Sequence, residues 1–115
     1  TGALEKPYWL NAGKCISYQT IENKGEIEPA LISCLQNNVY GCDICQQVCP
    51  WNRFAVPHNT PEFFPSDEFL SLDSEKLKEM DEEAFRRIFR DSAVKRAKFQ
   101  GLKRNVQALD KPAQK

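Results

Sequence analysis

Three cysteines and a proline stand close together near the middle of this sequence: Cys42, Cys45, Cys49 and Pro50. The spacing of three between the first two lets both thiolates bind one metal group, with backbone N–H groups directed at its negative charge. Cys49 follows four residues later and faces another direction, and Pro50 prevents a helix from continuing past it. Gly41 allows the chain to turn into this run. The run therefore predicts a metal or redox site on a short, interrupted helix.

The remaining cysteines favour metal binding over a disulfide framework. The chain has five cysteines, an odd number, and all of them lie before residue 50. The sequence does not begin with a charged segment followed by an apolar run, so it predicts no export signal. No apolar run reaches the roughly 18 residues of a transmembrane helix. Because disulfides are typical of exported proteins, we expect a cytoplasmic protein that does not enter a membrane and uses its thiols for metal or redox chemistry.

The cysteine run matches part of a known ligand pattern. Bacterial ferredoxins bind pairs of [4Fe–4S] clusters with C-x2-C-x2-C-x3-C-P, and the last three cysteines and the proline of that pattern are present here. Cys15 is the natural substitute for the missing first cysteine. Two such clusters need four thiolates each, more than the five cysteines available, so we expect the chain to be a fragment of a longer protein.

Other uses of the cysteines stay open. A structural zinc site would use Cys15, Cys42, Cys45 and Cys49. The C-x2-C spacing suits zinc, whereas C-x3-C-P is unusual for it, and the thiols could instead be free or disulfide-linked. Cys34 lies beside Leu31 and Leu35 on one face of a predicted helix, so we expect it to be buried as an apolar residue rather than to bind metal.

Composition divides the chain into a cysteine-bearing half and a charged half. Residues 54–65 contain three prolines and predict an extended connector. We expect residues 1–53 to form an incomplete half of a cluster-binding domain and residues 66–115 to form a helical region. There is little strand signal, so the predicted fold class is mostly α.

Helical periodicity and capping residues give the expected elements. The sequence predicts a short helix opened by Pro29, and helices over 71–80, 81–90 and 93–109, the second of which is capped by Asp81. The expected buried side chains of the charged half are Leu70, Leu72, Leu77, Phe85, Ile88 and Phe89. We also expect Trp9 and Trp51 to pack against other parts of the fold.

A net charge of zero hides separate acidic and basic blocks. Residues 61–83 carry nine acidic and two basic side chains, whereas residues 84–115 carry ten basic and two acidic ones. Such blocks are usual on solvated helix faces, although a basic block can also follow a phosphate backbone. The candidate nucleic-acid contacts are Arg96, Lys98, Lys103 and Arg104.

Three stretches together resemble the epoxyqueuosine reductase family: CISYQTIE at 15–22, GCDICQQVCPWN at 41–52 and KRAKFQGLKRNVQAL at 95–109. Members of that family reduce epoxyqueuosine in tRNA to queuosine with a cobalamin and two [4Fe–4S] clusters. The resemblance implies a ferredoxin-like, two-cluster fold in which Cys15, Cys42 and Cys45 bind one cluster and Cys49 is a ligand of the other. The family's other cluster ligands, cobalamin region and acid catalyst match no part of this chain. The resemblance therefore implies a C-terminal fragment that contains no catalytic residue and is inactive alone.

The implied role is to conduct electrons from a donor such as a flavodoxin or ferredoxin to the corrinoid, with the basic residues contacting tRNA. We expect a monomer. Two alternatives remain: a ferredoxin-like electron-transfer module of another corrinoid-type oxidoreductase, and a zinc-stabilised interaction or RNA-binding domain without redox chemistry.

Overall fold

The computed structural model describes residues 1–110, and most of its regular elements are helices, which confirms the expected mostly α class. In chain order the elements are β1 (Leu4–Lys6), β2 (Trp9–Leu10), η1 (Ala12–Lys14), α1 (Ile16–Ile21), α2 (Pro29–Ile32), α3 (Ile44–Gln47), η2 (Pro50–Phe54), η3 (Pro61–Phe63), α4 (Asp67–Leu70), α5 (Ser74–Glu79), α6 (Glu82–Ile88), η4 (Ala93–Ala97) and α7 (Lys98–Asp110). None of the helices within residues 1–110 is long and apolar enough to cross a membrane.

A short antiparallel hairpin begins the chain and was not predicted. Strand β1 pairs with β2 so that Leu4 faces Leu10. Tyr8 turns the chain with a left-handed φ of 61°, a conformation for which Gly or Asn is the usual sequence signal. Strands this short, joined by a turn without that signal, leave no pattern that separates them from a loop.

Capping side chains fix where the helices of the charged half begin. The carboxylate of Asp81 accepts a hydrogen bond of 2.7 Å from the backbone N–H of Ala84, which confirms the predicted N-cap of α6. Asp73 caps α5 in the same way, with 2.8 Å from the N–H of Lys76 to its carboxylate oxygen. Each cap satisfies a backbone donor that the first turn of a helix would otherwise leave unpaired.

The helix predicted over 93–109 is divided in two, which corrects that prediction. Residues 93–97 form the 3-10 helix η4, and Lys98, with φ 63° and ψ 165°, changes the direction of the chain before α7. This break lets Val94 and Ala97 face the interior from η4 while Leu102 does so from α7. The buried side chains of the two helices therefore contact the core from two directions of the chain rather than from one continuous helix.

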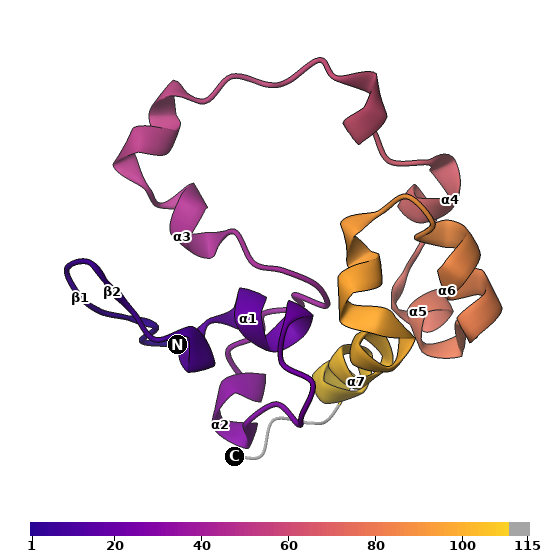
Figure 1. Cartoon of the computed structure of the whole chain (residues 1–115), viewed down its shortest axis with the longest axis horizontal. Helices are drawn as coiled ribbons and strands as arrows, with labels where there is room; N and C mark the ends of the chain where they lie inside the picture. Colours follow the sequence, from indigo (N-terminus) through magenta and orange to yellow (C-terminus); the bar gives the residue numbers. More distant parts are fainter. Residues whose placement is uncertain (111–115) are drawn as a thin grey trace.

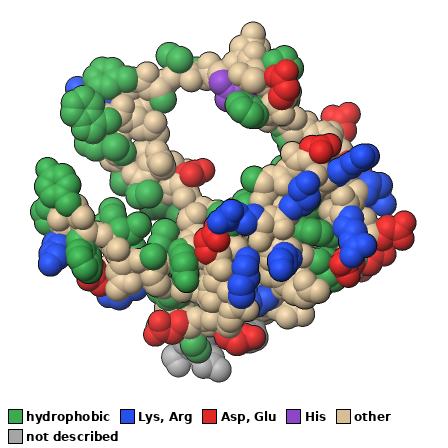
Figure 2. Space-filling view, viewed as in Figure 1, with side chains coloured by type: hydrophobic (Ala, Val, Ile, Leu, Met, Phe, Trp, Pro, Cys, Tyr) green, Lys and Arg blue, Asp and Glu red, His purple; other side chains and the backbone are tan. Residues whose placement is uncertain are grey.

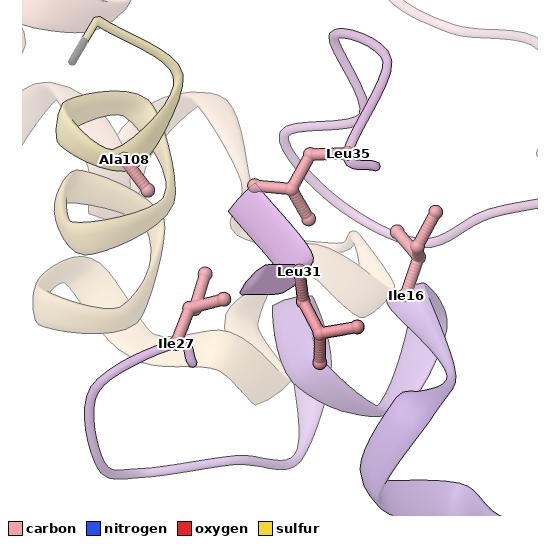
Figure 3. Close-up of a cluster of buried hydrophobic side chains, with 5 residues drawn as sticks. All are labelled: Ile16, Ile27, Leu31, Leu35 and Ala108. Carbon is pink, nitrogen blue, oxygen red and sulfur yellow. The ribbon is translucent and has the colours of Figure 1, made fainter. Parts of the chain in front are cut away.

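Helix α7 joins two hydrophobic clusters. One cluster consists of Ile16, Ile27, Leu31, Leu35 and Ala108 (Figure 3). The other consists of Met80, Phe85, Phe89, Val94 and Leu102. Because Ala108 and Leu102 both lie on α7, this helix packs against the cysteine half and the charged half at once (Figure 1). Leu70, expected in the core, is 65% exposed.

Between α3 and α4 the chain forms an arch that stands away from the two clusters (Figure 1). The arch, residues 48–66, contains the short helices η2 and η3 and otherwise extended backbone. Figure 2 shows an open space between the arch and the rest of the molecule. Trp51 is 78% exposed on the arch, and Trp9 is exposed on the hairpin, so neither tryptophan packs as expected.

Candidate metal centre

Four of the five cysteines line one cavity of about 560 Å³. These cysteines are Cys15, Cys34, Cys42 and Cys45. They come from three separate parts of the cysteine half: the start of α1, the turn after α2 and the segment that contains α3. All five cysteines are free thiols. The structure thus brings together three of the residues singled out from the sequence and adds Cys34 to them.

Cys15 lies at the junction of η1 and α1, which fixes its position. Its backbone N–H donates to the carbonyl oxygen of Ala12 at 2.9 Å, and its own carbonyl accepts from the N–H of Gln19 at 3.0 Å. Cys15 therefore occupies the N-cap position of α1 with extended backbone. The next residue, Ile16, is buried in the cluster beneath and also lines the cavity.

Cys42 is positioned through its neighbour Gly41 and the buried side chain of Thr20. Gly41 has a φ of 73°, a left-handed conformation that favours glycine, which confirms its expected role as a turn. The Gly41 N–H donates to Oγ1 of Thr20 at 2.9 Å, and that hydroxyl donates to the carbonyl of Ile16 at 2.8 Å. The hydroxyl of Thr20 therefore links α1, which starts beside Cys15, to the residue before Cys42.

Cys45 and Cys49 lie on different elements because helix α3, which contains Cys45, is short. Helix α3 ends at Gln47, and Pro50 opens the separate 3-10 helix η2. Asp43 occupies the N-cap position of α3, but its side chain makes no capping hydrogen bond. Cys45 lines the cavity, whereas Cys49 lies outside its lining.

The donor atoms and walls of the cavity fit an iron–sulfur cluster. Its apolar lining residues are Ala3, Leu4, Leu10, Ile16, Ile44 and Val48. Thiolate sulfur is the ligand that such clusters use, and burial among apolar groups is one of the factors that set their potential. The cysteines come from three separate parts of the chain, which suits a group that binds its ligands through several irons.

A single zinc ion suits this arrangement less well. Zinc gathers four ligand atoms around one centre, with zinc–sulfur distances of about 2.3 Å. Within residues 1–110, no three His, Cys, Asp or Glu side chains are grouped closely enough to hold a metal ion, so the thiols as they stand form neither a zinc site nor a finished cluster site. The zinc alternative also requires Cys49 beside Cys15, Cys42 and Cys45, and Cys49 is not part of their cavity.

The guanidinium of Arg104, a candidate nucleic-acid contact, has its hydrogen-bond partners within the protein. Its guanidinium donates to the carbonyl oxygens of Gln19 at 2.7 Å, Asn23 at 2.6 Å and Gly25 at 2.5 Å. Partial burial lowers the pKa of Arg104, yet a guanidinium stays charged in proteins. Arg104 therefore satisfies carbonyls at and beyond the end of α1, where a cation also suits the helix dipole.

The other three candidate nucleic-acid contacts differ in whether their charged groups have partners within the protein. The ammonium of Lys103 donates to the carbonyls of Lys78 and Met80, and so holds the end of α5. Arg96 pairs with Glu22, and this partner lowers the pKa of the carboxyl. The ammonium of Lys98 is exposed and makes no hydrogen bond or ion pair with any residue in the range 1–110. The charged groups of Lys103 and Arg104 thus have partners within the fold, and their expected contact with nucleic acid stays a prediction.

A shallow groove of about 370 Å³ beside Lys98 gathers further basic side chains. Its lining residues are Glu82, Phe85, Arg86, Arg90, Lys95, Lys98, Phe99 and Gln100. Glu82 is neutralised by its ion pair with Arg86 at 2.6 Å. Figure 2 shows Lys and Arg side chains concentrated over α6, η4 and α7. Sequence reasoning identified the basic block but could not separate its exposed members from those that hold backbone carbonyls.

Comparison with known proteins identifies both the domain and the relatives. Residues 1–52 match the family model described as a 4Fe-4S double cluster binding domain. Epoxyqueuosine reductase from Cellulophaga algicola is 46% identical over 95% of this chain and 36% of its own length. The Synechocystis sp. reductase is 44% identical over 94% of this chain and 38% of its own. The chain thus spans about a third of the length of these relatives.

A solved structure shares the fold. It is a crystal structure of epoxyqueuosine reductase with a tRNA-Tyr epoxyqueuosine-modified tRNA stem loop. Its TM-score to this chain is 0.84 at 32% sequence identity, over 95% of this chain and 29% of that one. The similarity includes both the cysteine half and the charged half.

Proposed function

The chain belongs to the epoxyqueuosine reductase family, and on that premise we propose that it is the iron–sulfur electron-transfer part of an enzyme that reduces epoxyqueuosine in tRNA to queuosine. The observation that carries the proposal is the single cavity lined by Cys15, Cys42 and Cys45 within the segment that matches a double-cluster domain. These three cysteines are proposed to bind one [4Fe–4S] cluster, and Cys49 to bind a second whose other ligands lie outside this chain.

The residues of this chain have three tasks in that function. The cysteines supply thiolates, Ile16 and Ile44 add apolar surface beside them, and the links through Thr20 and Gly41 hold the ligands at fixed positions. A bound [4Fe–4S] cluster supplies transfer of one electron at a time, at a potential set by burial and hydrogen bonding. Cobalamin, the second cofactor of the proposed reaction, is assigned to no residue of this chain.

The proposed arrangement has two parts joined by a connector. Residues 1–53 form part of a ferredoxin-like two-cluster domain, residues 54–65 connect it, and a helical region begins at residue 66; the last part of the region predicted to end at residue 115, residues 111–115, lies outside the described residues. An electron donor of the flavodoxin or ferredoxin type would reduce the first part, and the enzyme would act in the cytoplasm as a monomer.

The tRNA contact is proposed to use the groove beside Lys98. Arg90 and Lys95 line that groove with Lys98, and none of the three has an ion-pair partner among residues 1–110. Unpaired cations along a groove attract a phosphate backbone, and Phe99 adds an aromatic surface beside them. The related reductase bound to a tRNA stem loop supports RNA as the partner. Arg96 stays a weaker candidate because Glu22 neutralises it.

Modified nucleosides from cells provide the direct test. A full-length reductase that carries this chain should convert epoxyqueuosine to queuosine, whereas its Cys42→Ala variant should leave epoxyqueuosine in tRNA, measured by mass spectrometry. Val56→Ala, an exposed position on the arch, is the matched control and should behave as the parent protein does. Normal queuosine levels with Cys42→Ala would contradict the proposal. Zinc that resists replacement by iron and sulfide would support the non-redox alternative instead.

A further inference from the structure

A second groove, here called the arch groove, lies where the arch returns to the helices of the charged half. It has a volume of about 760 Å³ and is lined by residues of η3, α4 and α6 and of the turn after α6. Three of its lining residues are aromatic and three are charged without an ion-pair partner among residues 1–110: Phe63, Phe64, Phe69, Glu62, Arg90 and Asp91. Arg90 also lines the groove beside Lys98, so the two grooves adjoin at this side chain.

Two aromatic rings of the arch groove are exposed although the backbone that carries them is fixed. Phe63 is 73% exposed and Phe64 is 56% exposed. The N–H of Phe63 donates to the carbonyl of Thr60, and that of Phe64 donates to the carbonyl of Pro61, each at 3.1 Å. The ring of His58 lies beside both, with centroid distances of 5.6 Å. Exposed rings at fixed positions are typical of surfaces on which nucleobases stack.

The opposite wall of the arch groove is joined to the core of the charged half. Phe69 meets the buried Phe89 edge to face, with ring centroids 5.9 Å apart. Glu68 on α4 pairs with Arg87 on α6 at 2.9 Å. These two contacts fix α4 against α6, so the groove has a constant shape on this side. Figure 2 shows hydrophobic and acidic side chains together where the arch returns to these helices.

The two adjoining grooves differ in charge. The groove beside Lys98 carries unpaired cations, which attract phosphate groups. The arch groove carries the carboxylates of Glu62 and Asp91, which repel phosphate. A nucleobase is neutral, its amino groups can donate to a carboxylate, and its face can stack on an aromatic ring. The first groove therefore suits the backbone of a nucleic acid and the second suits a base.

We propose that the arch groove binds one unpaired base of the RNA whose phosphates lie along the groove beside Lys98. The inference rests on the proposed function, which assigns that neighbouring groove to tRNA. Bases in a loop can leave their stack and insert between side chains, whereas bases in a duplex are held by their partners. Arg90, at the junction of the two grooves, contacts the phosphate of the inserted nucleotide.

Affinity for a tRNA stem loop tests the proposal in a full-length reductase that carries this chain. The probes are stem loops in which one unpaired nucleotide at a time, other than the modified one, lacks its base but keeps its phosphate. In the parent protein the loss of one particular base should weaken binding about tenfold. In Phe63→Leu combined with Phe64→Leu the intact stem loop should bind about tenfold more weakly, and removal of that base should have no further effect.

Three further variants show whether stacking is responsible. Phe54→Leu removes an exposed ring from the arch outside the groove and should retain the pattern of the parent protein. Phe63→Tyr combined with Phe64→Tyr keeps two aromatic faces and should retain the preference for the base. The dependence of binding on salt should be unchanged in the leucine double variant and reduced in Lys98→Gln, because only the latter loses a phosphate contact.

The outcomes separate this inference from the proposed function. If the leucine double variant loses affinity equally for every probe, the two rings pack against protein rather than RNA, and the inference is overturned. It is also overturned if no single base matters in the parent protein. In both cases a reduced salt dependence in Lys98→Gln would leave the proposed tRNA groove in place, whereas an unchanged salt dependence would contradict that groove as well.

Discussion

The side-chain amide of Asn105 donates a hydrogen bond of 2.8 Å to the carbonyl oxygen of Thr20, 85 positions away in the sequence. The same amide donates to the carbonyl of Val39, also at 2.8 Å, and its oxygen accepts from Arg104. Asn105 and Thr20 are both completely buried. One amide on α7 thus satisfies backbone groups on α1 and on the segment that leads into Cys42, so the charged half helps to position the cysteine segments.

Asn105→Ala is expected to destabilise the chain by about 2–4 kcal/mol, because the buried carbonyls of Thr20 and Val39 lose their donor. The free energy of unfolding in urea measures the effect on the metal-free chain. Gln107→Ala, at an exposed position of the same helix, is the control and should change stability by less than about 0.5 kcal/mol. An equal effect of the two substitutions would contradict the role of Asn105.

Gly41→Ala is expected to cost about 1–2 kcal/mol of stability, because an alanine must adopt the left-handed φ of 73°. A Cβ at Gly41 meets only Cδ1 of Ile21, at 4.0 Å, so the cost comes from the backbone rather than from a clash. If the backbone shifts to relieve this cost, Cys42 moves, and the iron retained by the full-length reductase should fall as well. Gly25→Ala, where φ is ordinary and the nearest contact is 3.5 Å, should leave both quantities nearly unchanged.

Lys95→Gln combined with Lys98→Gln should weaken binding of a tRNA stem loop and reduce its dependence on salt. Each lost phosphate contact should lower the slope of log K against log salt by about 0.7–0.9. The control is Lys6→Gln with Arg53→Gln, which removes the same charge from exposed positions outside the groove. Equal losses in the two double variants would mean that total charge, not the groove, determines binding.

We expect the free energy of unfolding to change at high pH because of the phenol of Tyr40. Burial raises the pKa of its phenol, and the O–H donates to the carbonyl of Ala93 at 2.6 Å. Since the folded protein favours the protonated phenol, this contribution is complete below the ordinary tyrosine pKa of about 10 and is lost as the pH rises through the higher folded value. Tyr40→Phe should remove about 0.5–1.5 kcal/mol at neutral pH.

The pH profile distinguishes that hydrogen bond from simple packing. Between about pH 9 and 12 the difference in unfolding free energy between the parent chain and Tyr40→Phe should shrink, because only the parent loses a favourable interaction on titration. A difference that stays constant over this range would show that the phenol proton makes no contribution.

Sequence reasoning succeeded where a local rule fixes the structure. The cap at Asp81 follows from a side chain that reaches the N–H three residues later, and the turn at Gly41 follows from the freedom of glycine. The start of the helix at Pro29 is confirmed, whereas the expected extension of that helix past Cys34 to Leu35 is wrong, since the helix ends at Ile32. These features depend on a few neighbouring residues and can be read from the sequence.

Sequence reasoning failed where the structure depends on contacts between residues that are far apart in the sequence. Arg104 and Lys98 are both basic residues in one block, yet only the former has backbone carbonyls of α1 within reach. The break at Lys98 depends on which side chains of η4 and α7 meet the core, and the exposure of Trp51 depends on the arch standing clear of the rest of the molecule. Periodicity describes one segment at a time and carries no information on such contacts.

The dependence of the cysteine half on α7 also sets an order of events during synthesis. The ribosome releases Cys15 through Cys49 well before it releases Arg104 and Asn105, which satisfy the carbonyls around α1. Until those residues emerge, the segments that carry the thiols lack the hydrogen bonds that hold them in place. The hydrogen bonds that hold the cysteine segments in place therefore form only after α7 is complete, and a nascent chain that stalls on the arch lacks them.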